Sequence, residues 1–92
     1  MDAYKIKKGT EFAVQGENGT YTLPRMSDLT LDDVEVFMQV KTADSLKEKL
    51  GTCKSFLLKY APELEAEGLG DMGYIQIFNA YADAQGATLG KF

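Results

Sequence analysis

The sequence predicts a small α+β domain, in which a short N-terminal antiparallel β-meander or hairpin packs on three to four α-helices. Two patterns support this expectation. In the predicted β-segment, residues 1–24, apolar residues alternate with mainly polar ones from residue 4 to residue 24, as in strands with one buried face. Residues 30–86 repeat their apolar residues at helical spacing, and residues 87–92 form a short tail. Since 92 residues suffice for one domain only, residues 1–92 are treated as a single unit.

The β-segment contains three alternating stretches that end at Pro24. In each of them two apolar residues stand two positions apart: Tyr4 and Ile6, Phe12 and Val14, Tyr21 and Leu23. Gly9 and the pair Asn18-Gly19 supply turn residues between the stretches, and Asn-Gly is a strong hairpin signal. A sheet this small needs a cover for its apolar face, and we expect the helices to provide it.

Start signals define the first two helices. Thr30 precedes the first, and its hydroxyl can cap free backbone amides. Ser45 precedes the second, and Glu48 three residues later completes a capping box. Gly51 lies within this second helix at a cost of about 1 kcal/mol relative to Ala, so we expect it to permit close packing.

The third predicted helix follows a short turn. Pro62 ends the second helix and opens a turn through residues 63–67. The last helix is expected from about Met72 to Gln85, with Asp71 as its cap and Gly86 just past its end.

Composition limits the classes of function. The formal net charge is −4 and the pI about 4.7, which disfavours nucleic-acid binding because that relies on Lys and Arg. No apolar run approaches the ~20 residues of a membrane span, and no signal peptide opens the chain. Cys53 is the single cysteine, which fits a reducing cytosol, and the sequon at Asn18 is interpreted as a turn.

Gly68, Gly70 and Gly73 stand in the G-x-G-x-x-G order of a dinucleotide-binding site. Such a site needs a β-strand before the glycines and a second parallel strand after the helix. Here the preceding residues 61–67 read as helical and acidic, and no parallel strand follows. We therefore interpret the glycines as a joint between two helices.

The triplet Asp44-Ser45-Leu46 resembles the site at which acyl carrier proteins carry phosphopantetheine on their serine. The context differs, because a β-segment precedes it. In addition, Lys47, Lys49 and Lys54 stand where carriers display an acidic recognition helix. Ser45 is better explained as a helix cap, and an acyl-carrier-like protein modified on Ser45 is kept as an alternative.

No catalytic, cofactor-binding or metal-binding residues are predicted, and we expect the protein not to be an enzyme. Four carboxylates gather near the first helix, at a helix start where such residues are common, and nothing in the sequence suggests that they are buried: Asp28, Asp32, Asp33 and Glu35. The chain has no histidine, which removes imidazole bases and the usual zinc ligand sets. Cys53 lies on an apolar stripe and is expected to be an inert core residue.

The region from Gly70 to Gly90 resembles the end of bacteriophage tail assembly chaperones of siphophages and prophages. Members of that family commonly finish with an amphipathic helix that carries an aromatic where Tyr81 stands, then a glycine and a short Leu-Gly tail. Upstream, Leu23-Pro24 and the helix opening at residues 28–33 also follow the family order. The chain departs from many relatives after Gly90, where they have an acidic residue and this chain has Lys91.

The resemblance implies a function in the host cytoplasm. Tail assembly chaperones coat the aggregation-prone tape measure protein until the tail tube polymerises around it, and they need no cofactor. Many are made as a short form and a longer form through a programmed backward ribosomal slip. Leu89-Gly90-Lys91 permits the codons of a G-GGA-AAA slippery sequence. The expected partners are the tape measure protein, further copies of the chain and a longer frameshifted form, with no nucleic acid or membrane. A generic protein-interaction module is a further alternative.

A holder of a long helical protein needs exposed apolar strips that accept amphipathic helices. Val36 and Val40 form a second apolar strip beside the main face of the first helix. Ile77 and Tyr81 are expected at the outer edge of the last helix. These four residues are the predicted partner contacts, and the alternative is that both strips are buried in the monomer or in a homo-oligomer.

Overall fold

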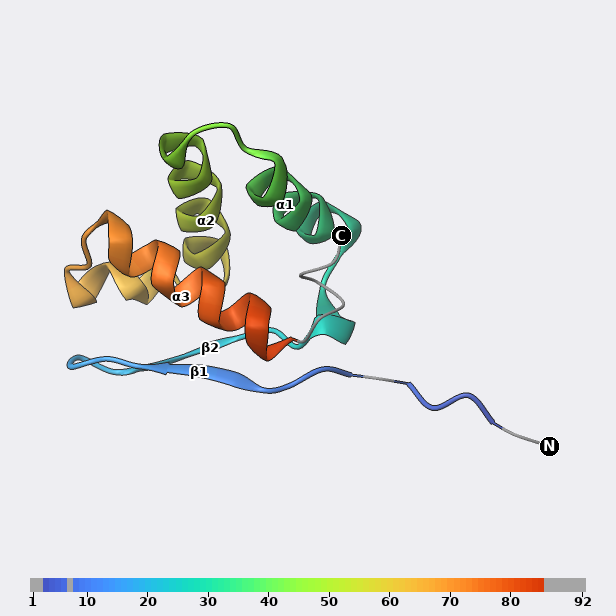
Figure 1. The fold of residues 1–92 in the computed structure, drawn as a ribbon. Helices are drawn as coiled ribbons and strands as arrows, with labels where there is room; N and C mark the ends of the chain where they lie inside the picture. The colour runs from blue at the N-terminus through green and yellow to red at the C-terminus, as the bar shows by residue number, and fades with distance from the viewer. Residues whose placement is uncertain (1–2, 7, 86–92) are drawn as a thin grey trace.

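The computed structural model describes residues 3–6 and 8–85, and the predicted position of Gly86, the 87–92 tail and Leu89-Gly90-Lys91 lie outside them. Within the described residues an antiparallel hairpin precedes three α-helices, which confirms the predicted α+β fold class (Figure 1). The elements in order are β1 (Phe12–Gln15), β2 (Thr20–Leu23), the 3-10 helix η1 (Met26–Asp28), α1 (Leu31–Thr42), α2 (Leu46–Tyr60), the 3-10 helix η2 (Pro62–Glu67) and α3 (Asp71–Ala84).

The hairpin pairs Phe12 with Leu23 and, at its other end, Gln15 with Thr20. The Gly16 N–H donates to the Gly19 carbonyl at 2.8 Å and closes the turn. No described residue other than glycine has a positive φ, so the turn is not the type I′ turn that Asn-Gly favours in hairpins. Its backbone amides are instead held by a carboxylate from η2, as described below.

The first alternating stretch does not form a strand in its described residues, so of the two predicted forms, meander or hairpin, the structure has the hairpin. The described residues 3–6 and 8–10 form an extended N-terminal arm that projects from the body (Figure 1). Tyr4 and Ile6 are 85% and 70% exposed. Gly9 has a φ of 87° and redirects the chain, so the alternating pattern here lacks a partner strand.

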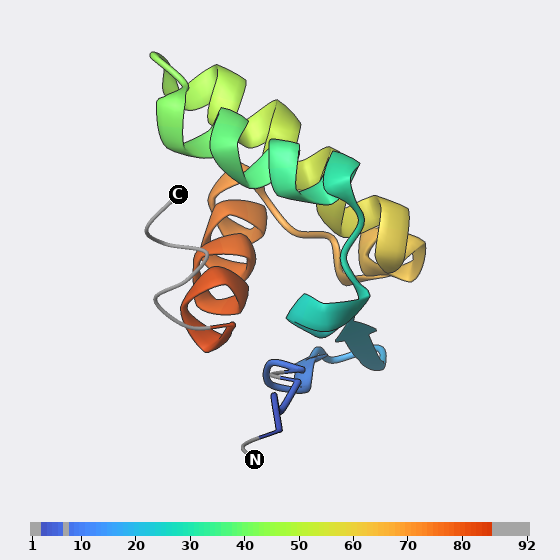
Figure 2. The ribbon, with the colours of Figure 1, turned by 90° about the vertical axis from the view of Figure 1, so that its right-hand side faces the viewer.

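All three α-helices lie on the same side of the hairpin, and α2 and α3, which contact β2 and β1, provide the cover expected for its apolar side (Figure 2). Aromatic rings from all three helices meet at the centre, with Phe37 lying 5.4 Å from Phe56 and 5.0 Å from Phe78 between ring centroids. Burying one such side chain contributes about 2–3 kcal/mol. Cys53 is buried among them, as predicted. The core consists of Tyr21, Leu23, Phe37, Cys53, Phe56, Leu57, Ala61, Leu64, Tyr74, Phe78 and Tyr81.

The predicted helix starts are confirmed for α1 and α2. Thr30 and Asp33 form a full capping box, since each side chain accepts a hydrogen bond from the other's backbone N–H. Ser45 accepts from the Glu48 N–H at 3.2 Å. The return bond from the Glu48 side chain is not among the hydrogen bonds of the described residues, so the second capping box is half formed.

The joint before α3 also follows the prediction, with one shift. Gly68 ends η2 with a φ of 64°, and the glycines follow a 3-10 helix rather than a strand, which confirms the interpretation as a joint. Gly70 takes the capping position, and Asp71, predicted as the cap, is the first helical residue. An added Cβ at Gly51 would meet nothing within 4 Å, so the expectation that Gly51 permits close packing was wrong.

A buried glutamine fastens the end of α3 to the base of the hairpin. The Gln85 side-chain carbonyl accepts hydrogen bonds from the N–H groups of Thr10 and Met26, at 3.3 and 2.9 Å. Its amide nitrogen donates to the Thr10 carbonyl at 2.7 Å. We call this set of contacts the Gln85 clasp.

Candidate partner-binding surface

The four predicted contact residues do not form one exposed surface. Val36, Val40 and Ile77 are half-buried and pack against the core. Tyr81 is fully buried, and the expectation that it lies at the outer edge of α3 was wrong. Its ring contacts Phe37, and its hydroxyl donates a hydrogen bond to the Pro24 carbonyl. Both the apolar ring and the polar hydroxyl of Tyr81 therefore interact within the fold.

An apolar hollow of about 400 Å³ lies between the first turns of α2 and α3. Leu46 and Leu50 line it from α2, and Met72 and Ile75 line it from α3. Leu46 and Met72 are large apolar side chains that remain 60% and 54% exposed. Lys47 and Asp71 complete the lining with one group of each charge. We call this site the α2–α3 hollow.

Local sequence explains how the hollow forms. Ser45 and Gly70 fix the starts of α2 and α3, so Leu46 and Met72 fall in the first turn of each helix. Leu50 stands four residues after Leu46 and shares its face. On α2 the apolar stripe becomes buried only from Cys53 onward, which leaves its N-terminal end open to solvent.

The amino-acid sequence does not by itself indicate this hollow. Leu46 and Leu50 stand at helical spacing with Cys53, so the pattern alone does not show that they are more exposed than Cys53. A helical stripe records which residues share a face, but not how far along that face the neighbouring helices reach. Leu46 and Met72, large apolar residues at the starts of their helices, were the local signals that this end is accessible.

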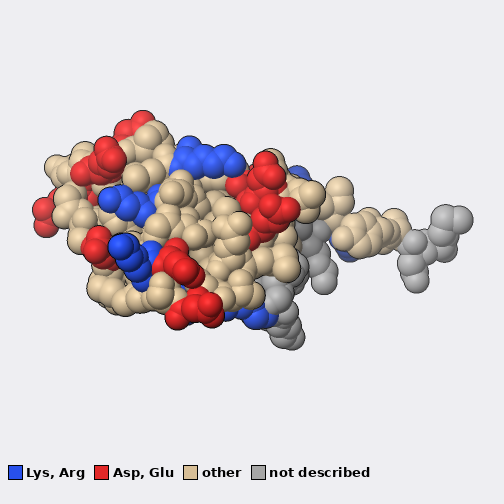
Figure 3. All heavy atoms as spheres, turned by 90° about the horizontal axis from the view of Figure 1, so that it is seen from above, with Lys and Arg blue, Asp and Glu red and all other residues tan. Residues whose placement is uncertain are grey.

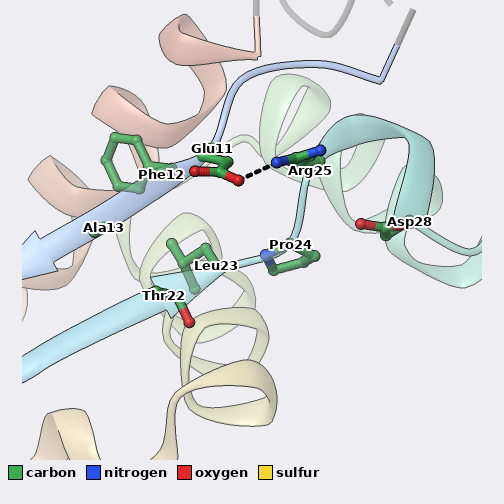
Figure 4. A pocket seen from close by; sticks show the side chains of 8 residues that line it. All are labelled: Glu11, Phe12, Ala13, Thr22, Leu23, Pro24, Arg25 and Asp28. Carbon is green, nitrogen blue, oxygen red and sulfur yellow. Dashed lines mark hydrogen bonds and ion pairs between the residues drawn. The ribbon is translucent and has the colours of Figure 1, made fainter. Parts of the chain in front are cut away.

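A second hollow, of about 540 Å³, lies beside the hairpin near η1 and has a mixed polar and apolar lining (Figure 4). Glu11 and Arg25 form an ion pair at its edge, with side chains 78% and 37% exposed. Such a solvated pair contributes little to stability, typically below about 1 kcal/mol. Asp28 and Thr22 also line the hollow.

Asp33 is buried, contrary to the expectation that the carboxylates near α1 are solvated. Burial by itself raises its pKa, but hydrogen bonds from Tyr60, from the Thr30 backbone and from Lys59 outweigh that effect and lower the pKa to about 2. The Lys59 ammonium lies 2.9 Å from the carboxylate. Because both carboxylate oxygens have partners, the geometry is that of a structural link between α1 and α2 rather than of an acid–base catalyst.

The other chemically interesting residues are separate from one another. Ser45 is exposed, and its hydroxyl oxygen serves as the cap of α2. Burial raises the pKa of the Cys53 thiol to about 11, against an opposing effect of Lys49, so the thiol is protonated at neutral pH. In the described part of the chain, no group of three or more His, Cys, Asp or Glu residues is placed to hold a metal ion.

Comparisons with known proteins return no family model, no curated protein and no solved structure that matches the chain. Among the described helices, none combines the length and the apolar character that crossing a membrane requires. Acidic and basic side chains are interspersed over the face that Figure 3 shows, without a continuous basic patch. The α2–α3 hollow is therefore the feature of the described surface that best suits a partner.

Proposed function

We propose that the protein is a bacteriophage tail assembly chaperone that binds the tape measure protein in the host cytoplasm. It keeps that protein soluble until the tail tube polymerises around it, and it uses neither a cofactor nor a catalytic residue. The family resemblance of residues 70–90 suggests this function. The observation that carries it is the α2–α3 hollow, an apolar site that two helices form together and that is open to solvent.

The chemistry of the α2–α3 hollow suits an amphipathic helix. Such a helix presents apolar side chains three or four residues apart, which can contact Leu46 and Met72 from outside. Completing the burial of these two side chains contributes about 1 kcal/mol each. One hollow thus supplies modest affinity, and many copies along a long helical partner add to it through multivalency.

Co-expression with the tape measure protein tests the site. Leu46→Glu combined with Met72→Glu places two charges in the hollow, and we expect affinity for the tape measure protein to fall at least about 30-fold. The control is Leu31→Glu, because Leu31 is equally large and 76% exposed but lies outside the hollow. When co-expressed with the control, the tape measure protein is expected to stay soluble. When co-expressed with the double variant, it is expected to be insoluble. Equal effects of both would assign binding to another surface.

Intact mass spectrometry of protein made from the native DNA, with downstream sequence and a pantetheinyl transferase present, tests the wider assignment. A minor, longer product with the same N-terminus would support the tail chaperone. A phosphopantetheine adduct on Ser45 would overturn it in favour of the acyl-carrier-like alternative, since Ser45 is exposed. If the soluble protein does not bind the tape measure protein and carries no adduct, the generic protein-interaction module remains as the alternative.

A further inference from the structure

The outer edge of β2 is an open strand edge within the described residues. The Gly16–Gly19 hydrogen bond sets the ladder so that Tyr21 and Leu23 share backbone bonds with β1. The N–H and C=O groups of Thr20 and Thr22 then point away from β1. No hydrogen bond between residues of the described ranges uses these groups.

This edge opens onto a groove of about 510 Å³, which we call the edge groove. The N-terminal part of β2 forms one wall, and Tyr60 and Ala61 from the end of α2 contribute to the other. Glu63 supplies its one charged lining residue, and it is acidic. An open strand edge beside a partly apolar wall is the kind of site that accepts an additional extended strand.

The N-terminal arm has the chemistry of such a strand. It is already extended, and Tyr4 and Ile6, two positions apart, are 85% and 70% exposed. Paired with β2, these two residues would face the same side and reach Tyr60 and Ala61, while Lys5 would face the other side.

Charge favours the same pairing. The first ten residues hold three of the chain's 10 basic residues but only one of its 14 acidic residues, so the rest of the chain is strongly acidic. Glu63 and Glu65 lie on η2, beside the edge groove.

Within one molecule, the Lys8 carbonyl accepts a hydrogen bond from the Ser27 N–H, and this bond fixes the base of the arm beside η1. From there the arm leads away from η2, where the groove lies (Figure 1).

We propose that the N-terminal arm of one copy of this chain binds as a third strand along the outer edge of β2 of a second copy. Thr20 and Thr22 supply the backbone hydrogen bonds, and Tyr4 and Ile6 fill the edge groove. This self-association does not depend on the proposed chaperone function. It assigns a role to the one part of the predicted β-segment that has no partner strand in the described chain.

A complementation experiment tests the pairing. The arm variant carries Tyr4→Ser and Ile6→Ser, and the edge variant carries Thr22→Pro, which removes an N–H that β1 does not use. In analytical ultracentrifugation, the unmodified protein is expected to associate with increasing concentration, whereas each variant alone remains monomeric. An equimolar mixture is expected to form a 1:1 heterodimer, because one variant retains the arm and the other retains the edge.

Controls make each outcome decisive. Leu31→Ser removes an equally exposed apolar side chain elsewhere and is expected to associate like the unmodified protein. If Thr22→Pro lowers the melting temperature, Ala66→Arg obstructs the edge groove from η2 without altering the strand. A monomeric unmodified protein, unchanged association of the arm variant, or a mixture that remains monomeric would each overturn the proposal.

Discussion

Asp33 combines two tasks at one position of α1. Its carboxylate caps the helix by accepting a hydrogen bond from the Thr30 N–H. It also accepts hydrogen bonds from Lys59 and Tyr60 at the far end of α2. A buried carboxylate without these donors would be strongly destabilising. The capping box at Thr30 could be expected from sequence, whereas the contacts to α2 depend on how the two helices pack.

Asp33→Asn is expected to lower the free energy of unfolding by about 2 kcal/mol at pH 7. The folded pKa of about 2 lies below the ordinary value of 3.8, so the ionised carboxylate stabilises the fold above about pH 4, and this stabilisation is lost as the pH falls towards 2. Urea unfolding at several pH values measures both effects. In the variant, the change in stability between pH 4 and 2 is expected to shrink.

Asp32→Asn is the matched control for this prediction. Asp32 occupies the same first turn of α1 but is exposed, so its replacement removes only a favourable interaction with the helix dipole, about 0.5 kcal/mol. Equal losses of stability in the two variants would contradict a special role of Asp33.

At the scale of elements, α2 carries a glycine that its packing does not require. Gly51 is exposed within the helix, and a Cβ there would meet open space. Gly51→Ala is therefore expected to raise the free energy of unfolding by about 1 kcal/mol, because Ala has the higher helix propensity. Thermal unfolding should show a melting temperature higher by roughly 4–8 °C.

Gly73→Ala serves as the comparison, because Gly73 also lies in a helix but its added Cβ would approach the Leu69 side chain to 3.2 Å. A smaller gain, or a loss, is expected there. If Gly51→Ala were destabilising while Gly73→Ala were neutral, the open space beside Gly51 would not describe the folded protein in solution.

The hairpin turn depends on η2 rather than on its own turn residues. The Glu67 carboxylate accepts hydrogen bonds from the N–H groups of Glu17 and Asn18, at 2.7 and 2.9 Å, and from the Tyr21 hydroxyl. The Tyr21 bond lowers the pKa of Glu67; burial opposes this, and the amides of Asn18 and Glu17 add to the lowering. The interaction is therefore present at neutral pH and is lost as the pH falls through the lowered folded pKa.

Glu67→Gln is expected to accelerate amide hydrogen exchange at Glu17 and Asn18, because a neutral amide accepts weaker hydrogen bonds than a carboxylate. Exchange measured by NMR at neutral pH checks this. Glu65→Gln on the same 3-10 helix is the control, since the Glu65 side chain has no hydrogen bond among the described residues. Unchanged exchange in the Glu67 variant would contradict the assignment.

At the scale of the whole molecule, the sequence predicted those features of the fold that local sequence signals determine. The α+β class, the starts of α1 and α2, and the glycine joint follow from caps, apolar periodicity and turn residues. Three features did not follow. Tyr4 and Ile6 alternate like a strand but lack a partner strand. Tyr81 is the centre of α3's buried face, and the α2–α3 hollow depends on how far two helices cover each other. Each of these is set by tertiary arrangement.

The Gln85 clasp also bears on the order in which the protein can fold. It joins residues 75 positions apart, whereas the hairpin and the contact between α1 and α2 join segments much closer in sequence. Contacts of short sequence separation form early, and distant ones wait for the loop between them to close. On a ribosome, the base of the hairpin thus stays unfastened until Gln85 has emerged, so the chain completes this fold only after all of its described residues have been synthesised.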